Sequence, residues 1–521
     1  MAPDSRRAID RKVIEYPPDV ELNVVVRDLT GPVDAEVDPD GNLIVAEGGH
    51  GKYDPKLFGL RPDGTVFNIY PASRKLRIPF LNPGFKIYGP VGGIALLNGQ
   101  VYVSHRDAEG LGVITAFSYD GRHRTIVGQL PTRGDFCIGD IAVAPGGNRL
   151  WFGVGSATNS GVVGLDNWEA GWVKTYEDFS DQPFTPLKLL GYQFRTKNPL
   201  AGLFGPDDVA VTAPFQPFNT SSRTRGARVQ NDRPTAAVYS CSPGGGGLRV
   251  EASGVRKPVG IAFNEFGSPY MTNQGMKLRG TRPITDDPDV LLKVVQGTWY
   301  GWPDFTANLQ PVTEQRYQPR PETIVETGYD EVYYLIDHQA SNPPTGLVRP
   351  SQALVRNALL QGVFAPLAGA ERIAFVPGTG PLSDFRGNAL VALSGDRAPF
   401  DTGGRKMLGP TGYKLMRVDI GKREVNEFIR NSVPGPASAQ KDPGRDALER
   451  PVSMCFDAEG GLYIIDFGGM RMKGGQEHVT AKSGRIFRLA PPPPASTQPS
   501  AEEANPPSTR RKQLELPDYD E

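Results

Sequence analysis

The chain has 521 residues, and its 57 Lys and Arg nearly balance its 58 Asp and Glu, which gives a formal net charge of −1. This balance argues against a nucleic-acid-binding protein, because such proteins normally carry a basic excess. With 62 Gly and 49 Pro, the sequence favours turns and short elements over long helices. No apolar stretch is long enough to predict a transmembrane helix.

The first residues show no apolar core of the signal-peptide type, and residues 1–19 are expected to form an N-terminal extension. The run from Val20 to Val26 has strand character. After it, one phrase recurs: an apolar alternation, a turn rich in Asp, Asn and Gly, and a second short apolar run. Its six copies begin at Pro32, Pro90, Cys137, Pro258, Glu371 and Pro451. Each copy predicts a β-hairpin.

Further strands follow most of these hairpins, which makes about four strands for each of the six units. Such a repeat predicts an all-β protein, a six-bladed β-propeller of four-stranded antiparallel blades over residues 20–489. Val20–Val26 is expected to supply the outer strand of the last blade. Long insertions at Ala157–Pro234 and Asn308–Gly369 are expected to lie over one face. Residues 490–521 are rich in Pro and are expected to form a disordered tail.

Propeller geometry places the residues before the first strand of each blade and those after its second strand at the same face, because the two strands are antiparallel. The side chains so placed are Glu47, His50, His105, Arg106, Asp107, Asp135, Phe136, Cys137, Asn159, Arg256, Lys257, Asn273, Gln274, Arg450 and Asp466. Their convergence predicts a ligand-binding mouth. Loop ends are polar in any propeller, and this plainer interpretation stays open for each single residue.

Some of these residue types indicate particular chemistry. Arg256 and Lys257 could bind a carboxylated ligand, since guanidinium and ammonium groups pair with carboxylates. The stretch Asn273, Gln274 and Gly275 could hold a hard cation such as Ca²⁺ through its oxygens. His105 is a candidate general base that Asp107 could orient, and the alternative is an ordinary loop histidine.

Four stretches together resemble the glucose/sorbosone dehydrogenase family. They are ATNSGVVGLDN from Ala157, GVRKPVGIAFNEFG from Gly254, YGWPDF from Tyr300 and RPVSMCFDAEGGLYIIDFG from Arg450. The resemblance covers roughly residues 22–489. It implies a six-bladed propeller that uses pyrroloquinoline quinone (PQQ) with Ca²⁺ to oxidise a sugar or alcohol, and a periplasmic or secreted location.

The resemblance also implies roles for single residues. Asp135 corresponds to a catalytic position, and the cofactor-binding positions correspond to Asn159, Arg256, Lys257 and Arg450. The sequence departs from the family pattern at four positions, and at two of them, Cys137 and Ser180, one branch of the family is expected to have His. Phe136 stands where the family has its general-base His, and Lys257 stands where the family has Asn.

These departures leave three hypotheses open. The first is a PQQ-dependent sugar dehydrogenase-like oxidoreductase with an altered base and an unidentified electron acceptor. The second is a non-catalytic propeller that binds carbohydrate or a protein partner. A calcium-dependent lactonase-type hydrolase is a weaker third, since other six-bladed propellers host that reaction.

Overall fold

The computed structural model describes residues 8–71, 85–184, 186–199, 201, 208–222, 226, 228–319, 331–338, 353–403, 409–440 and 446–492. Strands dominate these residues, and the longest α-helix among them is α3 (Ala353–Leu359). None of the helices in this part of the chain has the length and apolar character that a membrane span requires. The predicted tail lies outside the described residues from position 493 onward.

Six antiparallel sheets confirm the predicted all-β, six-bladed propeller. Blade one is β3 (Pro32–Val37), β4 (Leu43–Glu47), β5 (Lys56–Leu60) and β6 (Val66–Tyr70), and blade two is β7 (Tyr88–Leu97), β8 (Gln100–Arg106), β9 (Gly112–Ser118) and β10 (His123–Leu130). Blade three is β11 (Ile138–Val143), β12 (Leu150–Val154), β17 (Ala237–Cys241) and β18 (Arg249–Ser253), with β22 (Thr298–Trp299) added in parallel at its edge.

Blade four is β19 (Pro258–Phe263), β20 (Pro269–Asn273), β21 (Pro288–Lys293) and β23 (Leu360–Pro366). Blade five is β24 (Ala370–Phe375), β25 (Ala389–Leu393), β26 (Lys414–Asp419) and β27 (Glu424–Asn431), and β1 (Ile14–Glu15) of the N-terminal extension pairs with β27. Blade six is β28 (Pro451–Phe456), β29 (Leu462–Asp466), β32 (Gly484–Ala490) and β2 (Glu21–Leu29).

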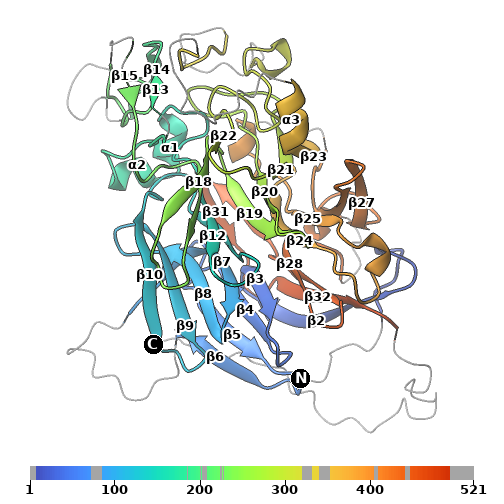
Figure 1. Ribbon diagram of the computed structural model, residues 1–521. Helices are drawn as coiled ribbons and strands as arrows, with labels where there is room; N and C mark the ends of the chain where they lie inside the picture. The colour runs from blue at the N-terminus through green and yellow to red at the C-terminus, as the bar shows by residue number, and fades with distance from the viewer. Residues whose placement is uncertain are drawn as a thin grey trace, which may run out of the picture.

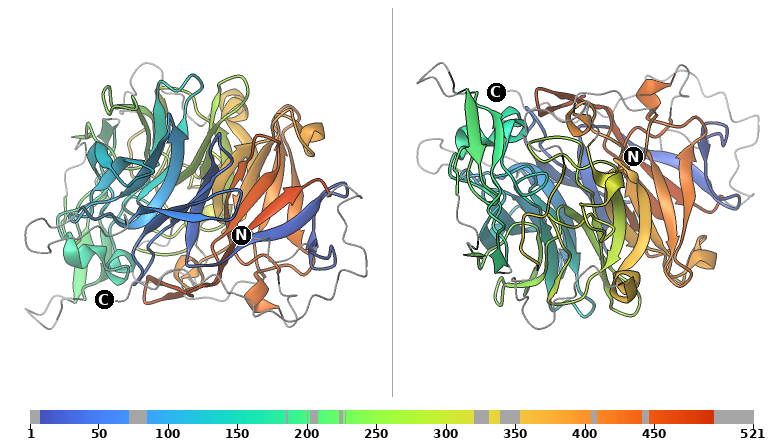
Figure 2. Two further views of the ribbon diagram at one scale, coloured as in Figure 1. Left: turned by 90° about the horizontal axis from the view of Figure 1, so that it is seen from below. Right: turned by 90° about the horizontal axis from the view of Figure 1, so that it is seen from above.

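The two ends of the ring are joined within blade six. Strand β2 pairs antiparallel with β32, with Leu22 opposite Leu489, and this confirms that the run after residue 20 supplies the outer strand of the last blade. Alternate residues of β2 are buried, as expected for a strand with one face on the core. Figure 2 shows the sheets following one another around a common centre, with blue β2 beside the orange and red strands of the last blades.

The insertions carry short elements and a hydrophobic core of their own. They contain α1 (Leu165–Glu169), α2 (Trp172–Thr175), β13 (Leu187–Lys188), β14 (Phe194–Lys197), β15 (Val209–Thr212), β16 (Arg228–Val229) and a 3₁₀ turn at Gln315–Tyr317. The elements α1, α2, β13 and β14 gather at the upper left of Figure 1. Leu189 bridges to Ile336 of the other insertion, and apolar side chains from both form one buried cluster.

The second insertion differs from its predicted bounds. Strand β23 (Leu360–Pro366) lies inside the range that we expected to be loop, and it is the outer strand of blade four. It was missed because a long insertion, rather than a short Gly-rich turn, separates it from β21. The remaining elements are the β30–β31 hairpin (Met470–Lys473, Gln476–Val479) and 3₁₀ turns at Ser383–Phe385, Phe400–Thr402 and Ala437–Ala439.

A buried ion-pair group lies where the inner strands converge. From blade five, Arg372 places its Nε 3.2 Å from Asp34 of β3 and 3.4 Å from Asp140 of β11. Its guanidinium also donates to the carbonyl of Gly92 in β7, and Asp34 accepts a 2.7 Å hydrogen bond from Ser453 of β28. Through these contacts, Arg372 and Asp34 together connect the inner strands of five blades.

Glycines let these inner strands approach one another closely. A Cβ added at Gly92 would lie 2.0 Å from the Ile138 carbonyl oxygen of the next blade, and one at Gly139 would lie 2.6 Å from the Pro258 carbonyl oxygen. Real Cβ atoms do not approach backbone oxygens so closely. Each inner strand contacts the next, and β28 contacts β3, which closes the ring. This ring therefore depends on glycine, which has no Cβ, at positions such as Gly92 and Gly139.

We expect Arg372→Met to destabilise the ring by about 3–5 kcal/mol, because it leaves Asp34 and Asp140 buried without their cation. Chemical denaturation followed by fluorescence measures this change. The control is Arg386→Met, which removes an exposed ion pair with Glu265 and is expected to cost no more than about 1 kcal/mol. Equal midpoints for the two variants would contradict the role of Arg372.

Gly92→Ala is expected to lower the yield of folded protein or the melting temperature sharply, because the added methyl meets backbone of the neighbouring strand. Gly128→Ala in β10 is the matched control, since a Cβ there has nothing within 4 Å. Circular dichroism melting curves compare the two. Similar melting temperatures would show that the inner strands can separate without cost.

Candidate functional site

A cavity of about 320 Å³ opens at one end of the channel, and residues of all six blades line it. The lining includes the predicted residues His50, Arg106, Asp135, Phe136, Cys137, Arg256, Lys257 and Gln274. The structure thus brings together part of the ligand-binding mouth that the sequence predicted. The other polar lining residues are Lys277, Arg279, Glu371, Arg372, Arg397, Asp401 and Glu477.

Arg256 precedes β19 and is buried beside the cavity. Its Nε and Nη2 donate to the backbone and side-chain oxygens of Asn159, at 3.0 and 2.9 Å. Its Nη1 donates to the carbonyl oxygens of Gly275, at 2.9 Å, and Gln274, at 3.4 Å. Burial lowers the Arg256 pKa to about 10, and nearby Arg279 acts in the same direction. Asn159 itself does not line the cavity but holds Arg256 in place.

The stretch Asn273, Gln274 and Gly275 does not fit a calcium ion as the sequence suggested. The carbonyl oxygens of Gln274 and Gly275 accept from Arg256, and the Asn273 Oδ1 accepts from the backbone N–H of Lys257 at 3.0 Å. A hard cation requires several free oxygens. Among the described residues, no group of three or more His, Cys, Asp or Glu side chains could hold a metal ion.

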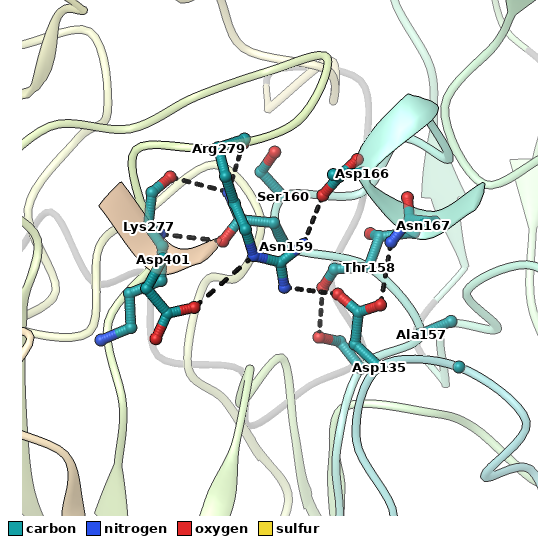
Figure 3. Close-up of polar contacts among 12 residues, drawn as sticks. Asp135, Ala157, Thr158, Asn159, Ser160, Asp166, Asn167, Lys277, Arg279 and Asp401 are labelled. Carbon is teal, nitrogen blue, oxygen red and sulfur yellow. Dashed lines mark hydrogen bonds and ion pairs between the residues drawn. The ribbon is translucent and has the colours of Figure 1, made fainter. Parts of the chain in front are cut away.

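Arg279 is the centre of a second buried ion-pair group, which Figure 3 shows between Asp135, Asp166 and Asp401. Its Nη2 lies 2.5 Å from Asp135, and its Nε lies 3.7 Å from Asp401. The second oxygen of Asp135 accepts from the side chains of Asn167, at 2.9 Å, and Trp172, at 2.8 Å. Asp135 therefore lines the cavity as a fully bonded carboxylate and orients no histidine.

His105 and Asp107 do not reach the cavity. The His105 side chain is buried, with Nδ1 2.7 Å from the Arg106 carbonyl and Nε2 2.8 Å from the Thr115 hydroxyl. Burial lowers the His105 pKa to about 4. Asp107 caps a turn by accepting from the Leu111 amide at 2.8 Å. Because successive side chains of a strand point to opposite faces, Arg106 lines the cavity and His105 does not.

Arg450 also lies outside the cavity lining. Its Nη1 donates to the carbonyl oxygens of Ser394, at 3.0 Å, and Asp396, at 2.9 Å. The nearby cation that does line the cavity is Arg397, which pairs with Glu477 at 2.5 Å. Arg397 follows β25, the second strand of blade five, slightly more closely than Asn159 follows β12, so the strand-end rule would have found it had it been applied to blade five. Glu477 lies in the β30–β31 hairpin, outside the strand ends that the rule considers.

Phe136 stands in the cavity beside two cations. The Arg256 guanidinium lies 4.7 Å from the centre of the Phe136 ring, and the Lys257 Nζ lies 5.4 Å from it. Such contacts are favourable because the ring face is electron-rich. Cys137, the next residue, is a free thiol that is partly exposed.

Three lining cations have no carboxylate partner within the part of the chain that the structure describes. Arg106 donates to the carbonyl oxygens of Thr132 and Gly134, Arg256 donates to carbonyl and amide oxygens, and Lys257 donates to the Gln274 amide oxygen at 3.0 Å. The remaining lining Lys and Arg residues each pair with a carboxylate. The cavity is therefore suited to an anionic ligand.

Solved structures show which folds this chain resembles. A Trichoderma reesei enzyme of carbohydrate-active family AA12, described as a calcium structure, matches with a TM-score of 0.50 and 14% identity over 94% of this chain and 99% of the other. The holo PQQ domain of a pyranose dehydrogenase from Coprinopsis cinerea gives 0.49 and 13%, over 92% and 98%. At 14% identity, the likeness to the Trichoderma reesei enzyme shows a similar fold and nothing further. No protein-family model matches the chain, and neither does any curated protein.

We expect Ca²⁺ or EDTA to leave the melting temperature of the protein within error, because Arg256 already occupies the carbonyl oxygens of Gln274 and Gly275. Differential scanning fluorimetry with and without millimolar Ca²⁺ measures this. Mg²⁺ at equal ionic strength is the control for a general salt effect. A rise of several degrees with Ca²⁺ alone would show that a calcium site exists despite this arrangement.

Proposed function

We propose that this propeller is an oxidoreductase of the PQQ-dependent sugar dehydrogenase type, with an altered proton acceptor. The observation that carries the proposal is the set of three lining cations without a carboxylate partner among the described residues. PQQ is a planar quinone with carboxylate groups, and Arg and Lys bind carboxylates with charge-assisted hydrogen bonds. The sequence resemblance to the glucose/sorbosone dehydrogenases supports the same ligand.

The lining residues fit such a group. Arg106 of blade two and Arg256 of blade four would hold its carboxylates, and the buried Arg106 Nε has no hydrogen-bond partner among the described residues. Phe136 and Trp172 add flat apolar surface to the lining. When bound, PQQ supplies a quinone that accepts a hydride equivalent from an alcohol carbon. We propose no role for Ca²⁺ here, because Arg256 already donates to the carbonyl oxygens of Gln274 and Gly275.

The substrate proposed with this cofactor is a small sugar or alcohol. Its hydroxyl group must lose a proton while the adjacent carbon loses hydride, so a proton acceptor has to face the cavity. By the same resemblance we expect a periplasmic or secreted protein and a separate electron acceptor.

A second candidate function is a non-catalytic propeller that binds carbohydrate or a protein partner. Phe136 favours it, since a phenyl ring accepts no proton, and Asp135 is held by Arg279. The lactonase hypothesis has less support, because it needs several ligands around one cation and the described residues offer no such group.

Titration of the protein with PQQ tests the proposal, and we expect saturable binding seen in the quinone absorbance. Arg106→Met should weaken binding about tenfold or more, as expected for one charge-assisted hydrogen bond. The control is Arg122→Met, since Arg122 is 83% exposed and pairs with Asp120. Oxidation of an aldose with an artificial electron acceptor separates the enzyme from the binding protein. Absence of PQQ binding would overturn the proposed cofactor.

A further inference from the structure

Two of the departures from the pattern of the resembling family, at Phe136 and Lys257, touch each other in the folded chain. Lys257, in place of Asn, holds its Nζ 5.4 Å from the ring centre of Phe136, which stands in place of the general-base His. Both residues line the cavity. An amine, which is able to accept a proton, therefore lies beside the position from which the imidazole is missing.

The surroundings of Lys257 do not compensate its charge. Its Nζ donates to the Gln274 Oε1 at 3.0 Å. The orientation of that amide is fixed, because the Gln274 Nε2 donates to the Ala370 carbonyl at 3.0 Å and the Glu371 carboxylate at 3.1 Å. The partner of Lys257 is thus a neutral oxygen, and the described residues place no carboxylate within ion-pair distance. Lys257 is only partly exposed, and a largely desolvated ammonium with a neutral partner loses its proton more readily than one in water.

The charged groups that face Lys257 are Arg256, Glu371, Arg397, Asp401 and Glu477. Burial lowers the Lys257 pKa to about 8. The Arg397 charge lowers this pKa further, whereas the Glu371 charge raises it. Asp401 and Glu477 lie beside Arg279 and Arg397, which reduces their effect on Lys257. Near pH 8, Lys257 is therefore a neutral amine in a substantial fraction of the molecules.

We propose that Lys257 is the proton acceptor of this cavity. It would take the role that a histidine at position 136 has in the resembling family, where this chain has Phe136. The role rests on the oxidoreductase function proposed above. The substrate O–H bond breaks and its proton goes to the neutral Nζ, which becomes an ammonium. The adjacent C–H bond breaks, and a bound PQQ would supply the acceptor for the hydride with its electron pair. The carbon–oxygen bond becomes a carbonyl, and the ammonium returns its proton to solvent.

Other groups at the cavity are already engaged. Asp135 is bonded to Arg279, Asn167 and Trp172. The His50 Nδ1 lies 2.6 Å from Glu477, and its Nε2 is buried without exposed surface. The lining carboxylate Glu371 accepts from Gln274 and Ser394. Compared with these groups, Lys257 has a single neutral hydrogen-bond partner and a place in the cavity lining.

The first test measures the amine itself, without PQQ. The full chain is reductively methylated with ¹³C-formaldehyde, and NMR follows its lysine signals against pH, with Lys257→Arg identifying the Lys257 signal by its loss. We expect this signal to titrate near pH 8 and the other lysines near the ordinary value of about 10.4. Titration of Lys257 together with the other lysines would overturn the proposal.

The second test uses the PQQ-loaded chain. Lys257→Met and Lys257→Arg should both lower kcat about 100-fold or more, because general base catalysis contributes at least that much. Lys257→Arg should bind PQQ nearly as well as the natural chain, since Arg106 and Arg256 still hold its carboxylates. Lys414→Met, which removes a lysine that pairs with Glu427 on blade five, is the control. Full kcat in Lys257→Arg would show that Lys257 acts only through its charge.

The pH profile supplies a readout that a structural role would not change. The neutral amine is the active form, so kcat should rise with pH through about 8 in the natural chain, and both Lys257 variants should lose this rise. If the natural chain binds no PQQ or oxidises no sugar, the proposed function fails and the proton-transfer role with it. An ordinary titration of Lys257 in a chain that does oxidise sugars would overturn the role of Lys257 alone.

Discussion

The ion pairs of Arg372 with Asp34 and Asp140 are the constraint on which the propeller depends. They lie where the inner strands converge, and they bind strands that are far apart in the sequence. Buried charges are stable only when they are paired and hydrogen-bonded, so the blades that supply them must stay in place. Glycines such as Gly92 and Gly139 keep the strands close enough for these contacts.

The same rule of charge pairing explains the character of the cavity. Arg279 lies among Asp135, Asp166 and Asp401, and these pairs hold the inserted segment around α1 against blade four. Most of the charges at the channel mouth are used in this structural way. The cations that remain without a carboxylate among the described residues, Arg106, Arg256 and Lys257, give the cavity its preference for anions.

Phe136 and Lys257 are best understood as one change rather than two. A phenyl ring tolerates the nearby Arg256 and Lys257 cations and gains a favourable contact with them. A protonated imidazole at the same place would meet two like charges, which lower the pKa of a histidine. A phenyl ring at position 136 and a lysine at position 257 are therefore physically compatible, and this compatibility is visible only when the two side chains are seen together.

The sequence by itself determined the fold of this protein. The six repeated hairpins predicted the blades, and the strand character after residue 20 predicted how β2 closes the ring, because period-two patterns and turn residues act locally. Propeller geometry also brought Phe136, Arg256 and Lys257 to one mouth.

Only the tertiary structure decided the chemistry there. Side chains alternate along β8, and the packing of the blades places His105 against Thr115 of β9 and Arg106 at the cavity. The partners of Arg279 and Glu477 come from loops whose course depends on packing between distant segments. Which charges remain unpaired is a property of that packing, and no local pattern in the sequence records it.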